Sequence, residues 1–377
     1  MKTIKFGIIG CGLMGKEFAS AAARWCHIDG VGARPEIVAV SDVNPAAMAW
    51  FTSHFDVPQA TADYRELLAN PDVEAVYCAV PHNLHQEMYT AILAAGKHLF
   101  AEKPFGIDLA AAEAIGRAIE TAIELRPDLL VRCSSEFPFF PAAQRIVTMA
   151  QQGAFGRIIE VRAGFLHSSD LDPNKAINWK RRIATNGEYG CMGDLGLHVL
   201  HIPLRLGFTP KNVRALLSKI VETRPDGKGG AVPCETWDNA ILACEAGAGF
   251  PMVLETKRIS PGDTDTWYLR IVGTENSAEF STHRPKTLRT LPYQPGGPQA
   301  WHEEDLGYEG AYKAITGHIF EFGFPDAILQ MWASFLDELA GNAPKFPCAT
   351  PAEALASHRL FTAALESQRT GATVSVN

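Results

Sequence analysis

The sequence KTIKFGIIGCGLMG, residues 2–15, decides the fold of the N-terminal part of the chain. Its apolar run before the glycines predicts a buried strand, and the spacing of apolar residues after them predicts a helix from Leu13 to Trp25. Gly10, Gly12 and Gly15 match the pattern G-x-G-x-x-G between these two elements. A strand, a glycine-rich turn and a helix in this order are typical of a dinucleotide-binding βαβ unit.

The glycines have different physical tasks. Gly10 permits a tight turn, Gly12 lets the backbone approach a pyrophosphate, and Gly15 lets the helix pack closely on the strand. Free N–H groups at the start of the helix, around Leu13 and Met14, would face the phosphates. We therefore predict that this loop binds a dinucleotide through Gly10, Gly12, Leu13, Met14 and Gly15. A glycine-rich turn without a ligand is the alternative.

An acidic residue, Asp42, ends the next predicted strand. A carboxylate at this place accepts hydrogen bonds from the ribose hydroxyls of NAD and repels the 2′-phosphate of NADP, so we expect NAD as the cofactor and NADP less. Asp42 follows Gly15 by 27 residues, more than the roughly 20 usual for this fold, and we assign the excess to an inserted loop at 27–35. An exposed aspartate in the turn before Asn44 is the alternative.

Short apolar runs alternate with helical patterns through residues 1–135. Strands are predicted at 4–9, 36–41, 75–80, 97–101 and 129–134, and helices at 13–25, 45–55, 85–95 and 109–125. This alternation predicts a doubly wound parallel sheet of the Rossmann type. We expect residues 1–135 to form the NAD-binding domain.

Residues 136–377 have a different pattern and are predicted to form an α+β domain for substrate binding and oligomerisation. Longer strand-like runs with Gly-rich turns favour a mostly antiparallel open sheet. The segment 284–310, rich in Pro, Gly and charge, is predicted to be a surface loop. A helix at 351–367, with a capping box formed by Thr350 and Glu353, closes the chain and is expected to pack back on the first domain.

Composition excludes several classes of protein. The 377 residues include 34 basic and 42 acidic ones, and no basic run interleaves with aromatics, so we expect no nucleic-acid partner. No segment approaches the roughly 20 apolar residues that cross a bilayer, so we expect no membrane partner. The eight cysteines are scattered, which favours reduced thiols and a cytoplasmic protein.

Four further motifs narrow the family. They read VYCAVPHNLH (76–85), GKHLFAEKP (96–104), NWK (178–180) and GDLGLH (193–198). In this order and spacing they resemble the Gfo/Idh/MocA oxidoreductases, the glucose–fructose oxidoreductase and inositol dehydrogenase family, over nearly the whole chain. The resemblance implies hydride transfer with NAD and a homodimer or homotetramer.

Lys103 follows Glu102 at the expected C-terminal end of a parallel strand, where doubly wound folds bind ligands. An ammonium group there can hydrogen-bond a substrate hydroxyl and stabilise the alkoxide that develops as hydride leaves. The resemblance implies that Lys103 contacts both cofactor and substrate, that Glu102 borders the cofactor, and that the bond to Pro104 is cis. A solvated loop lysine is the alternative.

Asp194 and His198 are four residues apart and share one face of a predicted helix. An imidazole that titrates near neutrality can take a hydroxyl proton, and a neighbouring carboxylate can orient it or bind a second hydroxyl. The resemblance implies that His198 is the acid/base and that Asp194 contacts the substrate. An ordinary ion pair on a helix surface is the alternative.

Further site residues are predicted around these. Additional cofactor contacts are expected from Val80, Pro81, Asn83 and His85, and additional substrate contacts from Trp179, Lys180, Tyr189 and His201. Tyr189 lies where many relatives carry glycine, and His201 where the family commonly has Asp, so we expect both to reshape the substrate site. Asp194, His198 and His201 imitate a metal cluster, but no HExxH motif or cysteine ligand accompanies them, and no metal is expected.

Together these features predict an NAD-dependent dehydrogenase that acts on a CH–OH carbon of a sugar, polyol or glycoside. Two alternatives stay open. One is an enzyme that cleaves a glycosidic bond through transient oxidation by bound NAD, without net redox change. The other is a non-catalytic sugar or nucleotide sensor, because a fold alone does not fix function.

Overall fold

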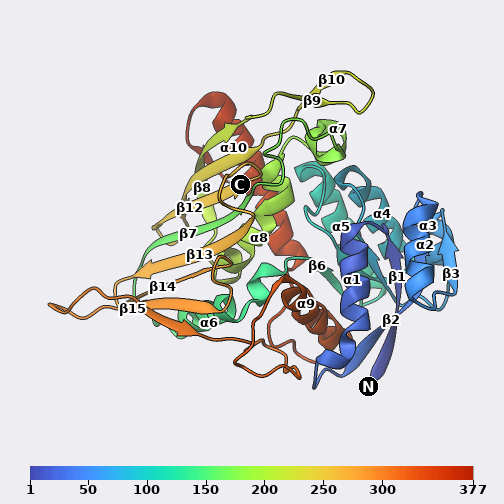
Figure 1. The fold of residues 1–377 in the computed structure, drawn as a ribbon, viewed down its shortest axis with the longest axis horizontal. Coiled ribbons are helices and arrows are strands. Elements are labelled where there is room, and N and C mark those ends of the chain that lie inside the picture. Colours follow the sequence, from blue (N-terminus) through green and yellow to red (C-terminus); the bar gives the residue numbers. More distant parts are fainter. Residues whose placement is uncertain (377) are drawn as a thin grey trace.

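Six parallel strands form the N-terminal sheet, in the order β3-β2-β1-β4-β5-β6 (Figure 1). The computed structural model describes residues 1–376. The strands are β1 (Lys2–Ile9), β2 (Ala33–Ser41), β3 (Gln59–Thr61), β4 (Ala75–Cys78), β5 (His98–Ala101) and β6 (Val131–Cys133). Strand order reverses between β1 and β4, and ligands of such sheets bind at the carboxyl ends of the strands at this point. The predicted doubly wound fold is confirmed.

Helices connect these strands, and side-chain caps fix where several of them begin. The helices are α1 (Leu13–Ala23), α2 (Pro45–His54), α3 (Tyr64–Ala69), α4 (His85–Ala94) and α5 (Leu109–Leu125). Asn44 accepts a hydrogen bond from the Ala46 amide at 3.0 Å, and Asp108 accepts one from the Ala111 amide at 2.8 Å. The short elements β3 and α3 have no sequence prediction.

The loop predicted at 27–35 is shorter than expected. Strand β2 already begins at Ala33, which pairs with Lys2. Pro35 is tolerated there because β3 borders β2 only at 39–41, so no neighbouring strand on that side requires a Pro35 N–H.

Nine strands form the second sheet, in the order β16-β15-β14-β13-β7-β12-β11-β8-β17. They are β7 (Ile158–His167), β8 (Pro210–Ser218), β11 (Asn239–Ala246), β12 (Pro251–Lys257), β13 (Asp265–Gly273), β14 (Asn276–Ser281), β15 (Thr287–Pro292), β16 (His302–Asp305) and β17 (Val374–Ser375). All neighbours are antiparallel except β7 and β12, which confirms the mostly antiparallel prediction. The two-stranded β9 (Thr223–Pro225) and β10 (Ala231–Pro233) project beside it (Figure 1).

The prediction of a surface loop at 284–310 is wrong, because this segment contains β15 and β16. Leu288 is buried in the core, and β15 pairs with β14. The flanking Pro and Gly residues hide this short alternating run in the sequence.

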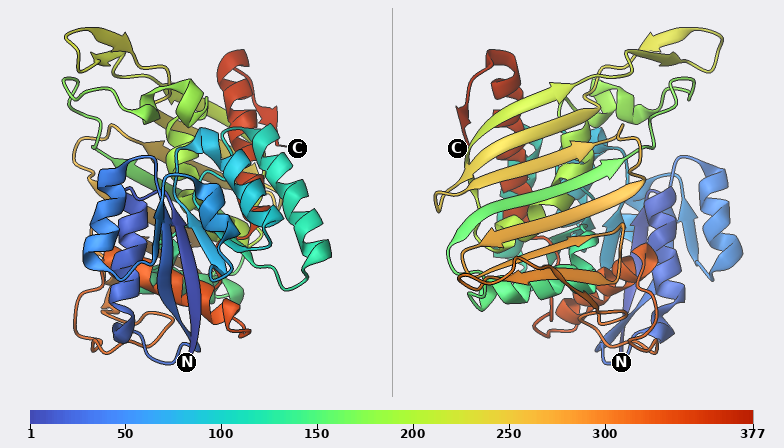
Figure 2. Two further views of the ribbon diagram at one scale, coloured as in Figure 1. Left: turned by 90° about the vertical axis from the view of Figure 1, so that its right-hand side faces the viewer. Right: turned by 60° about the vertical axis from the view of Figure 1, so that its left-hand side comes forward.

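Helices α6 (Pro141–Gln151), α8 (Cys191–Arg205) and α10 (Pro351–Thr370) cover one face of the second sheet (Figure 2). Helices α7 (Ile183–Asn186) and α9 (Phe324–Leu339) contact the first domain, α7 at the turn His82–Leu84 and α9 at α1 and β2. Helix α9 packs on α1, where Trp332 stacks on Phe18 with 3.7 Å between ring centroids. Helix α10 begins with the predicted capping box and contacts both α5 and α8. Within residues 1–376, no helix is both long and apolar enough to span a bilayer.

Candidate active site

The glycine loop lies between β1 and α1, at the carboxyl edge of the first sheet. Gly10 has a φ of +96°, and a Cβ there would lie 2.3 Å from the Ala79 carbonyl oxygen. A Cβ on Gly15 would lie 2.4 Å from the Gly10 oxygen, so this glycine permits close packing of α1 on the loop. A Cβ on Gly12 would meet no atom within 4 Å, which leaves the backbone open to an approaching pyrophosphate.

Asp42 lies at the end of β2 and braces this loop. One carboxylate oxygen accepts a hydrogen bond from the Cys11 amide at 2.7 Å, and the other accepts one from the Asn44 amide at 2.8 Å. Each oxygen retains a further lone pair for a ribose hydroxyl. The open backbone at Gly12 and the fixed carboxylate therefore fit a dinucleotide with a free 2′-hydroxyl.

A cavity of about 490 Å³ joins the loop to the second domain. Among the residues lining it are these predicted ones: Gly10, Gly12, Leu13, Met14, Asp42, Val80, Pro81, Glu102, Lys103, Trp179, Lys180 and Asp194. They come from both domains, so the two halves of the chain share one site. Its wall also includes His82, which packs edge-on against Trp179 with 4.9 Å between ring centroids.

This wall lacks three residues that were predicted to bind the cofactor: Gly15, which packs α1 on the loop, His85 and Asn83. His85 is fully buried, and its ring nitrogens face the carbonyl oxygens of Pro104 and Val80 at 2.7 and 2.9 Å. It fixes the backbone behind the cavity, and its expected direct contact with the cofactor is corrected on this ground. Asn83 is exposed in the 3₁₀ turn His82–Leu84 and does not line the cavity.

Lys103 follows β5, and the peptide bond between Lys103 and Pro104 is cis, as the resemblance implied. Its ammonium group donates to the Asp194 carbonyl oxygen at 3.0 Å and to the carboxylate of the same residue at 3.4 Å. Burial lowers the pKa of Lys103, but Asp194, Glu102 and Glu136 together raise it above its ordinary value. Lys103 is therefore a stable cation in the cavity wall.

Lys180 approaches the same carboxylate from the 3₁₀ turn Trp179–Arg181. Its ammonium group lies 2.9 and 3.0 Å from the two carboxylate oxygens of Asp194. Burial lowers the pKa of Lys180 to about 8, although Asp194 opposes this. Burial would raise the pKa of Asp194, but Lys180, Arg258 and Lys103 hold it well below its ordinary value. Asp194 is thus a carboxylate shared by two cavity-lining amines.

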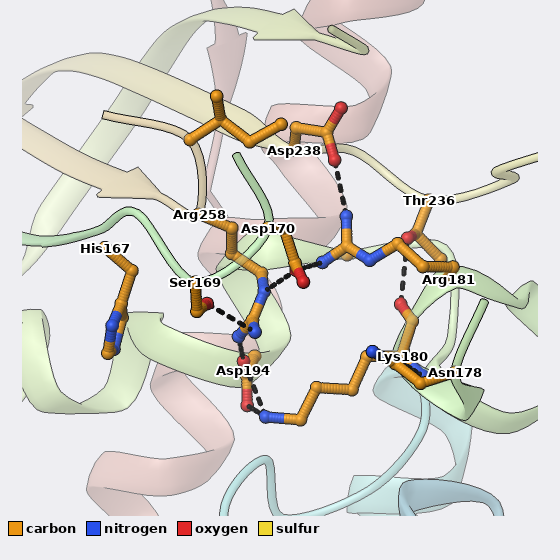
Figure 3. A network of polar contacts seen from close by, with 12 residues as sticks. His167, Ser169, Asp170, Asn178, Lys180, Arg181, Asp194, Thr236, Asp238 and Arg258 are labelled. Atoms are coloured by element: carbon orange, nitrogen blue, oxygen red, sulfur yellow. Dashed lines mark hydrogen bonds and ion pairs between the residues drawn. The ribbon is translucent and has the colours of Figure 1, made fainter. Parts of the chain in front are cut away.

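Arg258, at the end of β12, is a third cation on Asp194, and sequence reasoning missed it (Figure 3). Its Nε donates to Asp170 at 2.7 Å, while Nη1 donates to Asp194. The carboxylate of Asp170 also forms an ion pair with Arg181 at 2.8 Å, and Arg181 forms a second ion pair with Asp238. All residues of this ion-pair network are buried, so the network holds the Asp194 carboxylate in place on the side away from the two lysines. No local motif marks Arg258 or Asp170.

His198 lies one turn beyond Asp194 on α8 and is nearly inaccessible, with 1% of its surface exposed. Its Nδ1 lies 3.7 Å from a carboxylate oxygen of Glu136, and the rings of Phe137 and Phe165 pack edge-on against it. Burial, followed by the charge of Lys103, lowers the pKa of His198 well below its ordinary value. The imidazole is therefore neutral near pH 7.

The cavity wall lacks three of the predicted substrate contacts, which are His198, Tyr189 and His201. The Tyr189 hydroxyl bonds Thr362 of α10 at 2.7 Å, and the ring packs against Phe361. His201 is buried, and its Nε2 accepts a hydrogen bond from Arg205 at 3.0 Å. Neither side chain lines the cavity, so the expected direct effect of these two departures on the substrate is corrected.

Two family models match the chain. "Oxidoreductase family, NAD-binding Rossmann fold" matches residues 4–124, and "GFO/IDH/MocA C-terminal domain" matches residues 143–279. Together they cover more than half of the sequence. The chain belongs to the Gfo/Idh/MocA oxidoreductase family.

Several Gfo/Idh/MocA relatives resemble the chain over most of its length. Levoglucosan dehydrogenase of Pseudarthrobacter phenanthrenivorans is 27% identical over 85% of this chain and 89% of its own. The uncharacterized oxidoreductase YrbE of Bacillus subtilis is 31% identical over 76% of each chain. A solved levoglucosan dehydrogenase, in complex with NADH and levoglucosan, superposes with a TM-score of 0.88 at 24% identity, over 100% of both chains.

This Gfo/Idh/MocA protein is an NAD-binding oxidoreductase. The description of its first domain as NAD-binding confirms the predicted cofactor, and the open glycine loop and Asp42 agree with it. Among residues 1–376, no three His, Cys, Asp or Glu side chains gather in a way that could hold a metal ion.

Proposed function

We propose that the protein transfers a hydride between NAD and a CH–OH carbon of a sugar, polyol or glycoside. One observation carries this proposal: Lys103, Lys180 and Asp194 share a single cavity with the glycine loop and Asp42. A hydroxyl group both donates and accepts hydrogen bonds, so a wall that offers ammonium donors beside a carboxylate suits a polyhydroxylated ligand. The complexes of the solved relatives with levoglucosan and L-sorbose support a carbohydrate.

NAD, when bound, supplies the hydride acceptor. Lys103 and Lys180 donate to the substrate oxygen and stabilise its developing negative charge. Asp194 holds both ammonium groups and accepts from a second hydroxyl. His198 takes the hydroxyl proton, because one of the two ring nitrogens of a neutral imidazole carries no proton.

The test is a screen of monosaccharides, inositols, levoglucosan and glycosides, with NAD and with NADP, that follows the absorbance of the reduced cofactor. We expect NADH formation with at least one carbohydrate and a loss of kcat in Lys103→Ala. Cleavage of a glycoside without accumulation of NADH would favour the alternative of transient oxidation. No turnover in any assay would favour a sensor.

A further inference from the structure

Glu136 is a buried carboxyl group in the candidate site to which the proposed mechanism gives no role. It follows β6 directly before the 3₁₀ turn Phe137–Phe139, and 4% of its surface is exposed. Its Oε2 has no hydrogen-bond partner, and neither has Nδ1 of His198, the atom that it faces at 3.7 Å. Two unpaired polar atoms buried face to face cost free energy unless they bond to each other. Such bonds are often long in free enzymes and shorten when substrate binds.

We propose that Glu136 is a positioning residue that bonds Nδ1 of His198 and thereby fixes which ring nitrogen carries the proton. This inference rests on the proposed function, in which His198 exchanges a proton with the substrate. The flanking rings of Phe137 and Phe165 hold the imidazole on two sides but offer it no hydrogen bond. Glu136 is the group whose polar atom faces the Nδ1 edge.

The protonation state of Glu136 decides which nitrogen of the His198 imidazole carries the proton. A protonated Glu136 donates to Nδ1, so the single proton of the neutral imidazole lies on Nε2, which can then only donate. An ionised Glu136 accepts from Nδ1–H, so Nε2 has a free lone pair. In alcohol oxidation the substrate O–H bond then breaks and an Nε2–H bond forms, while the hydride leaves from carbon. The carboxylate balances the positive charge of the imidazolium until the proton passes to water.

The groups around Glu136 set the pH at which this change occurs. Burial raises the pKa of Glu136 to about 8, Lys103 opposes this, and Glu102 and Asp265 add to it. His198 itself is neutral in this range. Ionisation of Glu136 should therefore increase alcohol oxidation as the pH rises through about 8, and it should decrease reduction of the ketone. Lys180, whose pKa is also about 8, loses a proton over the same range in the wild type and in Glu136 variants alike, so the effect of Glu136 is the difference between their profiles.

The test is Glu136→Gln, which keeps the shape of the side chain but cannot titrate. We expect kcat for oxidation of the best carbohydrate of the screen to rise across about pH 8 in the wild type. In the variant we expect the rise to be absent, so that only the loss of the Lys180 ammonium group changes kcat with pH, and kcat to be about tenfold or more lower at pH 9. Glu136→Asp retains a titrating carboxyl and should retain a pH-dependent rise. Asp337→Asn, another buried carboxyl-to-amide change, on α9, should leave the profile unchanged.

A second measurement does not depend on activity. The ¹⁵N shifts of the His198 ring, assigned by their loss in His198→Gln, should report a tautomer change between pH 7 and pH 9 in the wild type and none in Glu136→Gln. Identical pH profiles and identical ring shifts in the wild type and Glu136→Gln would overturn the inference. Unchanged kcat in His198→Gln would instead overturn the role of His198 in the proposed function, and the ring shifts would still test the contact with Glu136.

Discussion

Replacing Arg258 by methionine removes the cation behind Asp194 and keeps most of the side-chain volume. The variant loses the contacts to Asp170 and Asp194, and the bond from Nη2 to the Ser169 hydroxyl at 3.0 Å. We expect it to fold and to be markedly less stable than the wild type.

The magnitude follows from the partners that remain. Breaking a buried ion pair so that one charge is left unpaired costs roughly 3–5 kcal/mol. Here neither carboxylate is left alone, because Asp170 keeps Arg181 at 2.8 Å and Asp194 keeps Lys180 at 2.9 Å. We therefore expect the lower end of that range, about 3 kcal/mol of unfolding free energy.

Urea unfolding followed by tryptophan fluorescence measures this difference. The matched control is Arg284→Met, which removes an arginine with 55% of its side chain exposed from a pair with Glu303 and should leave stability unchanged. A loss below about 1 kcal/mol in Arg258→Met would refute the reasoning, since it would mean that the buried network is not tightly coupled.

Three further predictions concern the site. Lys103→Ala should lower kcat by about 10²–10³-fold. The affinity for NAD, measured by fluorescence titration, should be nearly unchanged, because Asp194 keeps its ion pairs with Lys180 and Arg258 and the site stays in place. An unchanged kcat would remove Lys103 from the mechanism. Asp42→Ala should weaken NAD binding about tenfold and relax discrimination against NADP, measured as the ratio of kcat/KM values, since it removes the carboxylate that braces the loop; an unchanged ratio contradicts the assignment. For Glu136, the raised pKa means that the folded state holds its proton more tightly than the unfolded state, so wild-type stability should fall between pH 4.5 and about 8 by at most about 5 kcal/mol. Glu136→Gln should lack this loss and unfold at higher urea than the wild type at pH 9, and equal midpoints at that pH would count against the assignment.

Local motifs made part of this molecule predictable. The glycine loop and Asp42 could be predicted because their tasks depend on neighbours a few residues away and on the end of a strand. Lys103 follows from parallel-strand topology and Asp194 from helix spacing, whereas Lys180 could be predicted only from the resemblance of the NWK motif to the family. The parts tied to local geometry were thus open to prediction.

Long-range partners were not predictable in the same way. Arg258 donates to Asp194 although 64 positions separate them in the sequence, and no motif around either residue indicates this contact. For Tyr189 and His201 the sequence positions predicted substrate contacts. The structure instead has Tyr189 bonded to Thr362 and His201 bonded to Arg205, and these long-range partners determine where the side chains point. The ring of His85 points at the backbone carbonyl oxygens of Pro104 and Val80, which its position in the sequence did not reveal.

The contact of Trp332 with Phe18 has a consequence for how the molecule can be divided. The indole also meets Phe6, Tyr77 and Phe100, so a helix encoded near residue 332 completes the interior of the nucleotide-binding half. A fragment ending at residue 135 would expose this aromatic surface to water and should aggregate. Because Trp332 packs against rings of the first half, the two halves should resist hinge opening.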